Sequence, residues 1–372
     1  MPSNPLLGVF FHWLGGFASA SFYVPYRRVR GWSWEIFWLT GGIFSWLIAP
    51  WLFASLQTHG LTTVLGQAPR ELIFWCVFFG ILWGFGGLTY GLTMRYLGLS
   101  LGMAVVLGLC TVFGTLIPPL FRGEFAAKLL DTPSGRIILA GLLLTLLGIG
   151  VVAWAGAAKD RALSAAAKAA TIAEFNFGRG LAVAVFSGVM SSCFAFGLAA
   201  GEPLKPLSAA QGTGPLWTGL PVLCLVMFGG LLTNAVWCVL LIAKNKTAGQ
   251  WIGSSPSLLE SGVTDKLISD TGLTATLAPK PRLLSNYLLC AVAGTAWYFQ
   301  FFFYTMGESQ MGRLGFSSWT LHMASIIIFG TLWGFAFKEW QGSARAVRAT
   351  VVAGIGLLVL ATIVIGYGNS GA

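Results

Sequence analysis

Residues 137–157 read IILAGLLLTLLGIGVVAWAGA, and this stretch contains no charged side chain. An α-helix of about twenty apolar residues is long enough to cross ~30 Å of hydrocarbon. Nine other stretches have similar length and character, and the ten begin near Leu6, Phe37, Leu72, Leu99, Ile137, Gly180, Leu216, Leu283, Ser317 and Ala344. They lack the alternation of β-strands, and unpaired backbone groups are costly in lipid. The sequence therefore predicts an all-α polytopic membrane protein with ten transmembrane helices.

The overall composition excludes a water-soluble domain. Hydrophobic residues make up 56% of the chain and charged residues 9%, whereas soluble domains carry ~25% charge. The net charge of +10 does not indicate a nucleic-acid partner, because the basic residues lie in short clusters beside the apolar stretches, as in the cytoplasmic loops of membrane proteins. The expected surroundings are a lipid bilayer, and the sequence leaves the oligomeric state open.

The distribution of Lys and Arg predicts the orientation of the chain. The loops that join odd-numbered to even-numbered spans contain 16 of the 22 basic residues, and the opposite loops contain 6. The smaller set is Arg70, Arg122, Lys128, Arg136, Lys205 and Arg313. By the positive-inside rule the richer loops are cytoplasmic. Both termini are then predicted to be periplasmic in a bacterial inner membrane.

Short landmarks in the first five spans recur in the same order in the last five. The pairs are Thr93-Met94 with Thr305-Met306, residues 113–116 (FGTL) with 329–332 (FGTL), Phe121-Arg122 with Phe337-Lys338, and Ser134-Gly135-Arg136 with Ser343-Ala344-Arg345. Because each half has an odd number of spans, the second copy enters the membrane in the opposite sense. We therefore predict two inverted five-helix repeats, residues 1–157 and 179–372, with a cytoplasmic linker at 158–178 and a long cytoplasmic loop at 244–282.

Inverted repeats are typical of secondary transporters, in which two related units expose a central site alternately to the two sides. An ATP-driven pump is disfavoured because the chain has no Gly-x-x-x-x-Gly-Lys-Ser/Thr segment. A membrane enzyme would need a nucleophile with a base or clustered metal ligands, and a channel would repeat pore-lining motifs. We expect a transporter that is not an enzyme and that has no cofactor and no metal site.

Several longer motifs resemble those of one family. They are Trp32-Ser33-Trp34-Glu35, Gly41-Gly42 with Ser45-Trp46 and Pro50, residues 90–98 (YGLTMRYLG), residues 300–304 (QFFFY), Ser318-Trp319 with Leu321-His322-Met323, and Lys338-Glu339-Trp340. The chain resembles the L-rhamnose–proton symporter family of the drug/metabolite transporter superfamily, from about His12 to Trp340. The stretch from Thr247 to Lys280 does not match the expected pattern and resembles an insertion.

The resemblance implies proton-coupled uptake of L-rhamnose or a closely related deoxy sugar by alternating access. The alternative is a drug/metabolite-type carrier or exporter for another small solute.

A proton-coupled transporter needs a group that titrates within the membrane, and such groups are rare there unless functional. None of the twelve acidic residues lies in the middle of a span. The candidates are therefore His12 and His322 within spans, Glu35 at the start of span two, and Glu308 near the end of span eight. Three of the four have a stated structural alternative: a hydrogen-bonded neutral imidazole for His322, an interfacial position for His12, and an ion-paired interface residue for Glu35.

A neutral sugar is recognised by hydrogen bonds to its hydroxyls and by aromatic faces. On span eight, Trp297, Gln300 and Tyr304 share one helical face, and a mid-span amide needs a partner. Further candidate binding residues are Tyr90, Trp46, Trp38, Asn234 and Ser192. Ordinary packing or a lipid-facing position is the alternative for the aromatic residues. Arg95, at the end of span three, is a candidate gate, or it extends to the interface and is solvated there.

Overall fold

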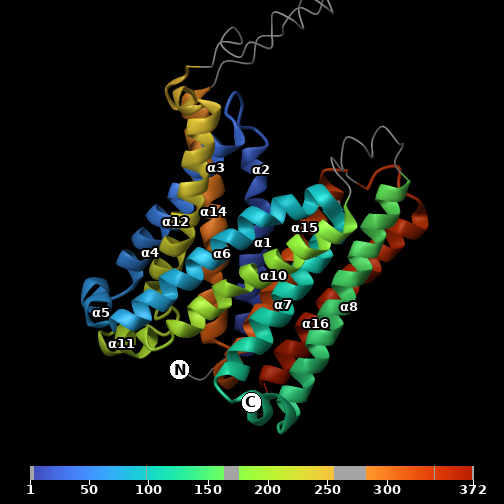
Figure 1. The fold of residues 1–372 in the computed structure, drawn as a ribbon. Helices are drawn as coiled ribbons and strands as arrows, with labels where there is room; N and C mark the ends of the chain where they lie inside the picture. Colours follow the sequence, from blue (N-terminus) through green and yellow to red (C-terminus); the bar gives the residue numbers. More distant parts are fainter. Residues whose placement is uncertain (1–3, 98, 163–175, 255–281, 339, 371–372) are drawn as a thin grey trace, which may run out of the picture.

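A computed structural model describes the chain except for residues 1–3, 98, 163–175, 255–281, 339 and 371–372. Among the described residues, ten helices are long and apolar enough to span a membrane, which confirms the predicted number. All the regular elements of the described residues are helical. Figure 1 shows them as one bundle, with both termini at the same end.

The first five spans begin within four residues of the predicted positions. They are α1 (Pro5–Ser21) with the short α2 (Tyr23–Tyr26), α3 (Trp34–Ile43) continued by the π-helix η1 (Phe44–Ile48) and α4 (Ala49–Gln57), α6 (Arg70–Leu97), α7 (Leu99–Phe121) and α8 (Pro133–Arg161). Helix α8 runs past Ala157, where the linker was expected to begin, because the Ala, Lys and Arg that follow favour helix. Two smaller elements are α5 (Leu61–Gln67) and the π-helix η2 (Ala126–Leu130).

The last five spans also match the prediction. They are α10 (Phe177–Ala200), α12 (Leu220–Asn245), α14 (Leu283–Ser309), α15 (Ser318–Ala336) and α16 (Arg345–Ser370). Shorter elements are α11 (Leu204–Ala210), η3 (Ala248–Ile252) and η5 (Gly312–Ser317). Helix α12 begins four residues later than expected because turns occupy residues 215–219, which start with Pro215 and end with Gly219. Residues 255–281 of the predicted long loop lie outside the described residues.

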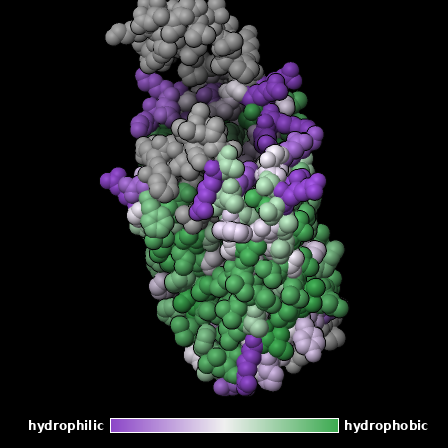
Figure 2. Space-filling view, turned by 90° about the vertical axis from the view of Figure 1, so that its right-hand side faces the viewer, coloured by the Kyte–Doolittle hydropathy of each residue, from purple (hydrophilic) through white to green (hydrophobic). Residues whose placement is uncertain are grey.

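The two ends of the molecule differ in character. The basic end carries the α2–α3 turn with Arg27, Arg28 and Arg30, and the start of α16 with Arg345 and Arg348. The terminal end carries both chain termini and the turns that follow α4, α7, α10 and α14. On the face seen in Figure 2, hydrophobic residues cover the body, and hydrophilic residues gather mainly toward the basic end. This surface suits a protein surrounded by lipid.

Glycines bring helices from the two predicted halves into close contact. Helix α8 packs along α16, where Gly141 faces Ile365 and Gly148 faces Leu358. Helix α6 packs along α10, with Gly86 against Ser191. At these three glycines an added Cβ would lie 2.3–2.8 Å from the opposite helix. Small residues let membrane helices approach this closely.

Helix α1 lies against two second-half helices, α14 and α15. A Cβ on Gly15 would lie 2.8 Å from the carbonyl oxygen of Gln300, and one on Gly16 would lie 2.5 Å from Ser325 Cβ. The hydroxyl of Ser325 lies 2.9 Å from the carbonyl oxygen of His12. The close approach places His12 of α1 beside residues of α14 and α15.

Candidate functional site

Two histidines from opposite halves of the sequence meet inside the bundle. His12 on α1 and His322 on α15 are both fully buried, and their ring centroids are 6.3 Å apart. Each lies about 10–12 Å along its helix from the terminal end, because it is the eighth or ninth residue of its span. Both side chains are thus enclosed by the helices around them.

Tyr304 of α14 joins the two imidazoles. Its ring centroid lies 5.3 Å from that of His12 and 5.4 Å from that of His322, with edge-to-face geometry in both cases. Trp319, one turn before His322 on α15, contacts both Tyr304 and His322 at 5.7 and 6.4 Å. The indole N–H of Trp319 donates to the carbonyl oxygen of Cys110 at 2.9 Å, which fixes the ring. We call His12, His322, Tyr304 and Trp319 the histidine cluster.

Three aromatic side chains, Phe194, Phe301 and Trp83, pack together beside the histidine cluster, and we call them the aromatic platform. The rings of Phe194 and Phe301 are stacked at 4.0 Å, and Phe194 also stacks with Trp319 at 6.0 Å. Trp83 packs edge-on against both phenylalanines. Flat apolar rings of this kind suit the C–H face of a sugar ring, provided that polar groups lie beside them.

Such polar groups are present, and many have no hydrogen-bond partner among the described residues. Both ring nitrogens of His12 and of His322 are buried and unpaired, and so is the amide nitrogen of Gln300. The same holds for Trp46 Nε1, Trp297 Nε1, Ser45 Oγ, Tyr298 OH and Ser318 Oγ. Buried polar groups in proteins are normally hydrogen-bonded, and an unpaired one costs about 1–3 kcal/mol. This concentration of unpaired groups in the core points to a site that binds polar molecules.

Gln300 is buried at the close contact between α14 and α1. It is 2% exposed, and Gly15 of α1 packs against its carbonyl oxygen. Tyr304 follows one turn later and is 3% exposed, so the predicted shared face of α14 lies inside the bundle. Trp297 is half-buried and packs against Phe22 at 4.3 Å.

Gly307 gives His12 the space that its ring occupies. A Cβ added to Gly307 would lie 2.7 Å from His12 Nε2 and 2.8 Å from Cε1. We expect Gly307→Ala to displace the imidazole and to reduce transport roughly tenfold, since overpacking costs ~1–3 kcal/mol. Initial uptake rates in proteoliposomes measure this effect. The matched control is Gly330→Ala on α15, where no described atom outside the local backbone of the helix and the adjacent residues lies within 4 Å of the new Cβ; equal rates for the two variants would contradict the expectation.

A cavity of about 220 Å³ connects the terminal end with Tyr304. Its wall is polar and carries charged residues that follow α7, residues that follow α10, and one residue near the end of α14: Arg122, Glu124, Lys128, Glu202, Lys205 and Glu308. Gln300 does not line this cavity, whereas Tyr304 does. We call it the vestibule. Since Tyr304 also contacts both imidazoles, the vestibule leads from the terminal end to the histidine cluster.

Ion pairs organise the vestibule. Arg122, at the end of α7, pairs with Glu202 and also donates to the carbonyl oxygen of Ala199 at 3.0 Å. Lys205 of α11 pairs with Glu308 of α14 at 2.8 Å. Burial alone would lower the pKa of the Lys205 ammonium, but the attraction of Glu308 outweighs it, and the net shift is upward. Glu308 is thus an ion-paired residue of the vestibule wall.

The basic end is closed by contacts between the α2–α3 turn and second-half residues. The indole N–H of Trp32 and the backbone N–H of Ser33 both donate to Gln250, at 2.8 and 2.6 Å. Asn286 exchanges two hydrogen bonds with the backbone of Arg30. These bonds fasten the turn to η3 and to the start of α14.

Glu35 belongs to this closure. It is 5% exposed and accepts hydrogen bonds from Asn245 Nδ2 and Thr247 Oγ1, both at 3.0 Å. It lies in the first turn of α3, at the basic end, whereas His12 and His322 lie nearer the terminal end. The structure therefore does not bring Glu35 to the histidine cluster.

Trp38 and Trp46 lie between the closure and the aromatic platform. The indole N–H of Trp38 donates to Asn234 Oδ1 at 3.0 Å, and the rings of Trp38 and Trp46 are 6.1 Å apart. Trp46 is 3% exposed, so it faces the core and not the lipid. It lies in η1, and π-helical turns inside α-helices occur frequently at functional sites.

Three other predicted residues lie elsewhere or cannot be placed. Ser192 is buried, but its hydroxyl donates to Val189 of its own helix at 2.6 Å. Tyr90 packs with a separate cluster of α6, α7 and α10 that contains Leu97. Arg95 belongs to α6, and its side chain lies outside the described residues. In the part of the chain that the structure describes, no three His, Cys, Asp or Glu side chains gather as metal ligands would.

The sequence interpretation missed Trp319, Phe301, Phe194 and Ser45 as site residues. Trp319 precedes His322 by one helical turn, and this spacing was a usable signal. Phe301 directly follows Gln300. Phe194 carried no signal, because 28 phenylalanines are spread over the chain. The position of Ser45 depends on the π-helix η1, which the sequence did not predict.

Comparison with known proteins assigns the chain to a family. Residues 1–258 and 266–371 match the family described as L-rhamnose-proton symport protein. Curated relatives from Salmonella gallinarum, Salmonella paratyphi B and Salmonella newport, each named L-rhamnose-proton symporter, are 34% identical over 363 residues, which is 97% of this chain and 97% of each relative.

The matched ranges correct one expectation. Only residues 259–265 fall between them, so most of Thr247–Lys280 is not an insertion relative to the family. The chain is a multi-pass membrane protein and belongs to the L-rhamnose-proton symport protein family.

Proposed function

We propose that this protein takes up L-rhamnose or a closely related deoxy sugar together with protons, by alternating access. One observation carries the proposal beyond family membership: the vestibule ends at Tyr304, which contacts the two buried histidines. A transporter needs an access route, a titratable group inside the membrane, and a polar site for its solute. The vestibule, the two histidines and the polar groups near Gln300 are candidates for these three parts.

His12 and His322 are the proposed proton carriers. Histidine changes charge near neutral pH more readily than other side chains. Two positive charges about 6 Å apart repel each other by ~3 kcal/mol at an effective dielectric constant of ~20, so the pair would carry one proton at a time. Each proton that moves inward gains ~2.3 kcal/mol per 100 mV of membrane potential.

The proposed sugar site is formed by side chains of the histidine cluster and of the aromatic platform. The Gln300 amide and the ring nitrogens of the histidines supply hydrogen bonds, while Phe301 and Trp319 supply apolar faces. Trp297, Trp46 and Trp38 with Asn234 would complete the site on the side of the basic end. Tyr90 and Ser192 have less support, because their contacts lie outside this region.

The arrangement represents a state with its access route at the terminal end and a closed basic end. We propose that the basic end is cytoplasmic, by the positive-inside rule, and that the termini are periplasmic in a bacterial inner membrane. Transport then requires the hydrogen bonds of Gln250, Glu35 and Asn286 to open while the vestibule closes. We propose Glu35 as a residue of this cytoplasmic closure. The division into inverted repeats 1–157 and 179–372 remains part of the proposal.

Uptake in proteoliposomes tests the function. With an acidic exterior, labelled L-rhamnose should accumulate above its external concentration, and unlabelled rhamnose should alkalinise the medium when added. Other deoxyhexoses and amino acids, supplied at the same concentration, establish the substrate class. Uptake that ignores the pH gradient, or a clear preference for an unrelated solute, would favour a drug/metabolite-type carrier instead.

Glu308→Gln separates a structural role of Glu308 from proton coupling. We expect the ratio of protons to sugar to stay at the wild-type value, while KM rises about two- to fivefold through loss of an ion pair worth ~0.5–1 kcal/mol. The raised pKa of Lys205 means that the pair is fully formed below the usual lysine range and is lost only as the pH rises through the higher value. The Lys205–Glu308 pair therefore adds no pH dependence to transport between pH values of about 5 and 8.

Simultaneous measurement of proton and sugar fluxes gives the ratio. Glu124→Gln is the matched control, since Glu124 pairs with Lys128 at 2.7 Å in the same vestibule and is more exposed than Glu308. A fall in the proton-to-sugar ratio for Glu308→Gln alone would assign proton transfer to Glu308.

A further inference from the structure

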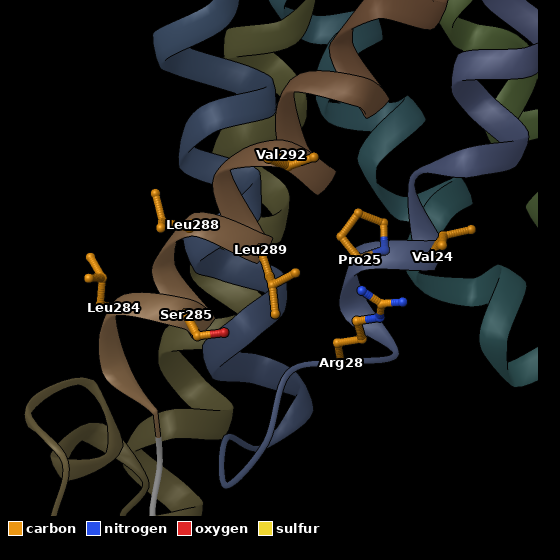
Figure 3. Close-up of a pocket in the computed structure, with 8 residues that line it drawn as sticks. All are labelled: Val24, Pro25, Arg28, Leu284, Ser285, Leu288, Leu289 and Val292. Carbon is orange, nitrogen blue, oxygen red and sulfur yellow. The ribbon is translucent and has the colours of Figure 1, made fainter.

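A groove on the lipid-facing surface lies at the basic end, where α2 meets the start of α14. Its volume is about 570 Å³, within the range of small-molecule sites. Val24, Pro25 and Arg28 form one wall, and Leu284, Ser285, Leu288, Leu289 and Val292 form the other (Figure 3). The groove is separate from the histidine cluster and from the vestibule, because it shares no lining residue with them.

The α14 wall is apolar and directed outward. Leu288 and Val292 are spaced one turn apart and are 58% and 59% exposed. Both lie within the first ten residues of a candidate membrane span, so the acyl chains of a bilayer are their expected surroundings. Together with Val24 and Pro25, this wall offers an apolar surface to an acyl chain.

Three features at the open end of the groove suit an anion. Arg28 is exposed, and among the described residues no carboxylate forms an ion pair with it. The neighbouring Arg27 differs, because its guanidinium lies over the ring of Phe337 at 4.2 Å. Across the groove, Ser285 points toward Arg28 with an exposed hydroxyl (Figure 3).

The third feature is the N-terminus of α14 itself. Its first turn contains no acidic residue, and the cap residue, Arg282, makes no side-chain hydrogen bond to it. The first backbone N–H groups of a helix have no partner within the helix and attract phosphate groups. Ser285 belongs to this first turn, so the hydroxyl, the N–H groups and the guanidinium converge on one region.

We propose that this groove is a binding site for an anionic phospholipid. The phosphate would lie between Arg28, Ser285 and the first turn of α14, and one acyl chain would run along Leu288, Leu289 and Val292. Basic pockets between transmembrane helices bind lipid head groups in this manner. The groove spans the contact between α2 and α14, so a bound lipid would bridge the two predicted halves beside the closure at the basic end.

Native mass spectrometry of the purified full-length protein tests the site. The probes are phosphatidylglycerol and phosphatidylcholine with identical acyl chains. We expect tighter binding of phosphatidylglycerol, and Arg28→Gln should weaken it about fivefold, since one basic residue contributes ~1 kcal/mol to the attraction of anionic lipid. Arg28→Lys should retain most of the affinity. Arg348→Gln, an exposed arginine at the same end on α16, is the matched control and should bind as the wild type does.

A second variant tests the apolar part of the site while leaving every charge in place. Leu289→Trp should fill the groove and weaken phosphatidylglycerol binding, whereas Leu360→Trp on the lipid-facing surface of α16 should not. Excess inorganic phosphate should not displace the lipid, because it cannot occupy the apolar wall. Equal binding of the two lipids, wild-type binding by Arg28→Gln, or an equal loss in Arg348→Gln would overturn the proposal.

Discussion

His322→Gln should abolish the coupling of sugar to protons while the protein still exchanges sugar across the membrane. Glutamine preserves much of the size and hydrogen-bonding capacity of histidine but cannot carry a proton at physiological pH. Sugar-induced proton uptake should fall at least about tenfold, because the mid-membrane region offers no carboxylate to replace the imidazole. Labelled sugar counterflow, which needs no net proton movement, should remain within about threefold of wild type.

Three comparisons make this experiment decisive. His12→Gln should have the same phenotype, and the double variant should be no worse than either single one, because the two rings act as one unit. His59→Gln is the matched control, since His59 is the third histidine and lies exposed in a turn at the terminal end. Normal coupling in both His12→Gln and His322→Gln would show that the protons move elsewhere.

Gln300→Ala should weaken sugar binding with less effect on coupling. The amide nitrogen is buried and has no partner in the part of the chain that the structure describes, so truncation costs the fold only packing while it removes a donor from the proposed site. A sugar hydroxyl left without its partner costs ~1–3 kcal/mol, so KM should rise about tenfold or more. Equilibrium binding of labelled L-rhamnose measures this directly, and the proton-to-sugar ratio of the remaining transport should be unchanged.

The control for Gln300 is Gln310→Ala, just past the end of the same helix. Its amide donates to Ser309 and lies outside the histidine cluster. Equal binding of L-rhamnose by Gln300→Ala and the wild type would move the sugar site away from α14. A loss of folded protein in detergent, without any change in sugar affinity, would instead assign Gln300 a packing role.

Much of the secondary structure could be read from the sequence. Hydrophobicity over about twenty residues is a local property that follows directly from the thickness of a bilayer. For this reason α1 and α14 begin within one residue of their predicted positions. The short helices α5 and α11 and the π-helix η1 were not predicted, because each depends on local packing at a span end or within a bend.

The candidate site was only partly predictable. His12, His322, Gln300 and Tyr304 attracted attention because polar side chains inside an apolar span are rare, and the structure brings them into one region. Glu35 and Glu308 attracted the same attention, but each is instead bonded to neighbours near one end of the molecule. Position along a span does not reveal which partner a carboxylate will meet.

By itself, the sequence determined the class of protein, the number of spans and the short set of polar residues that a transporter could use. These follow from hydrophobicity and residue chemistry, which act over a turn or two of helix. The tertiary structure decided which helices are neighbours: α1 lies against α14 and α15, and α8 lies along α16. Those contacts depend on glycines that allow close approach to residues some 200–300 positions away in the chain, and no local pattern encodes the choice of partner.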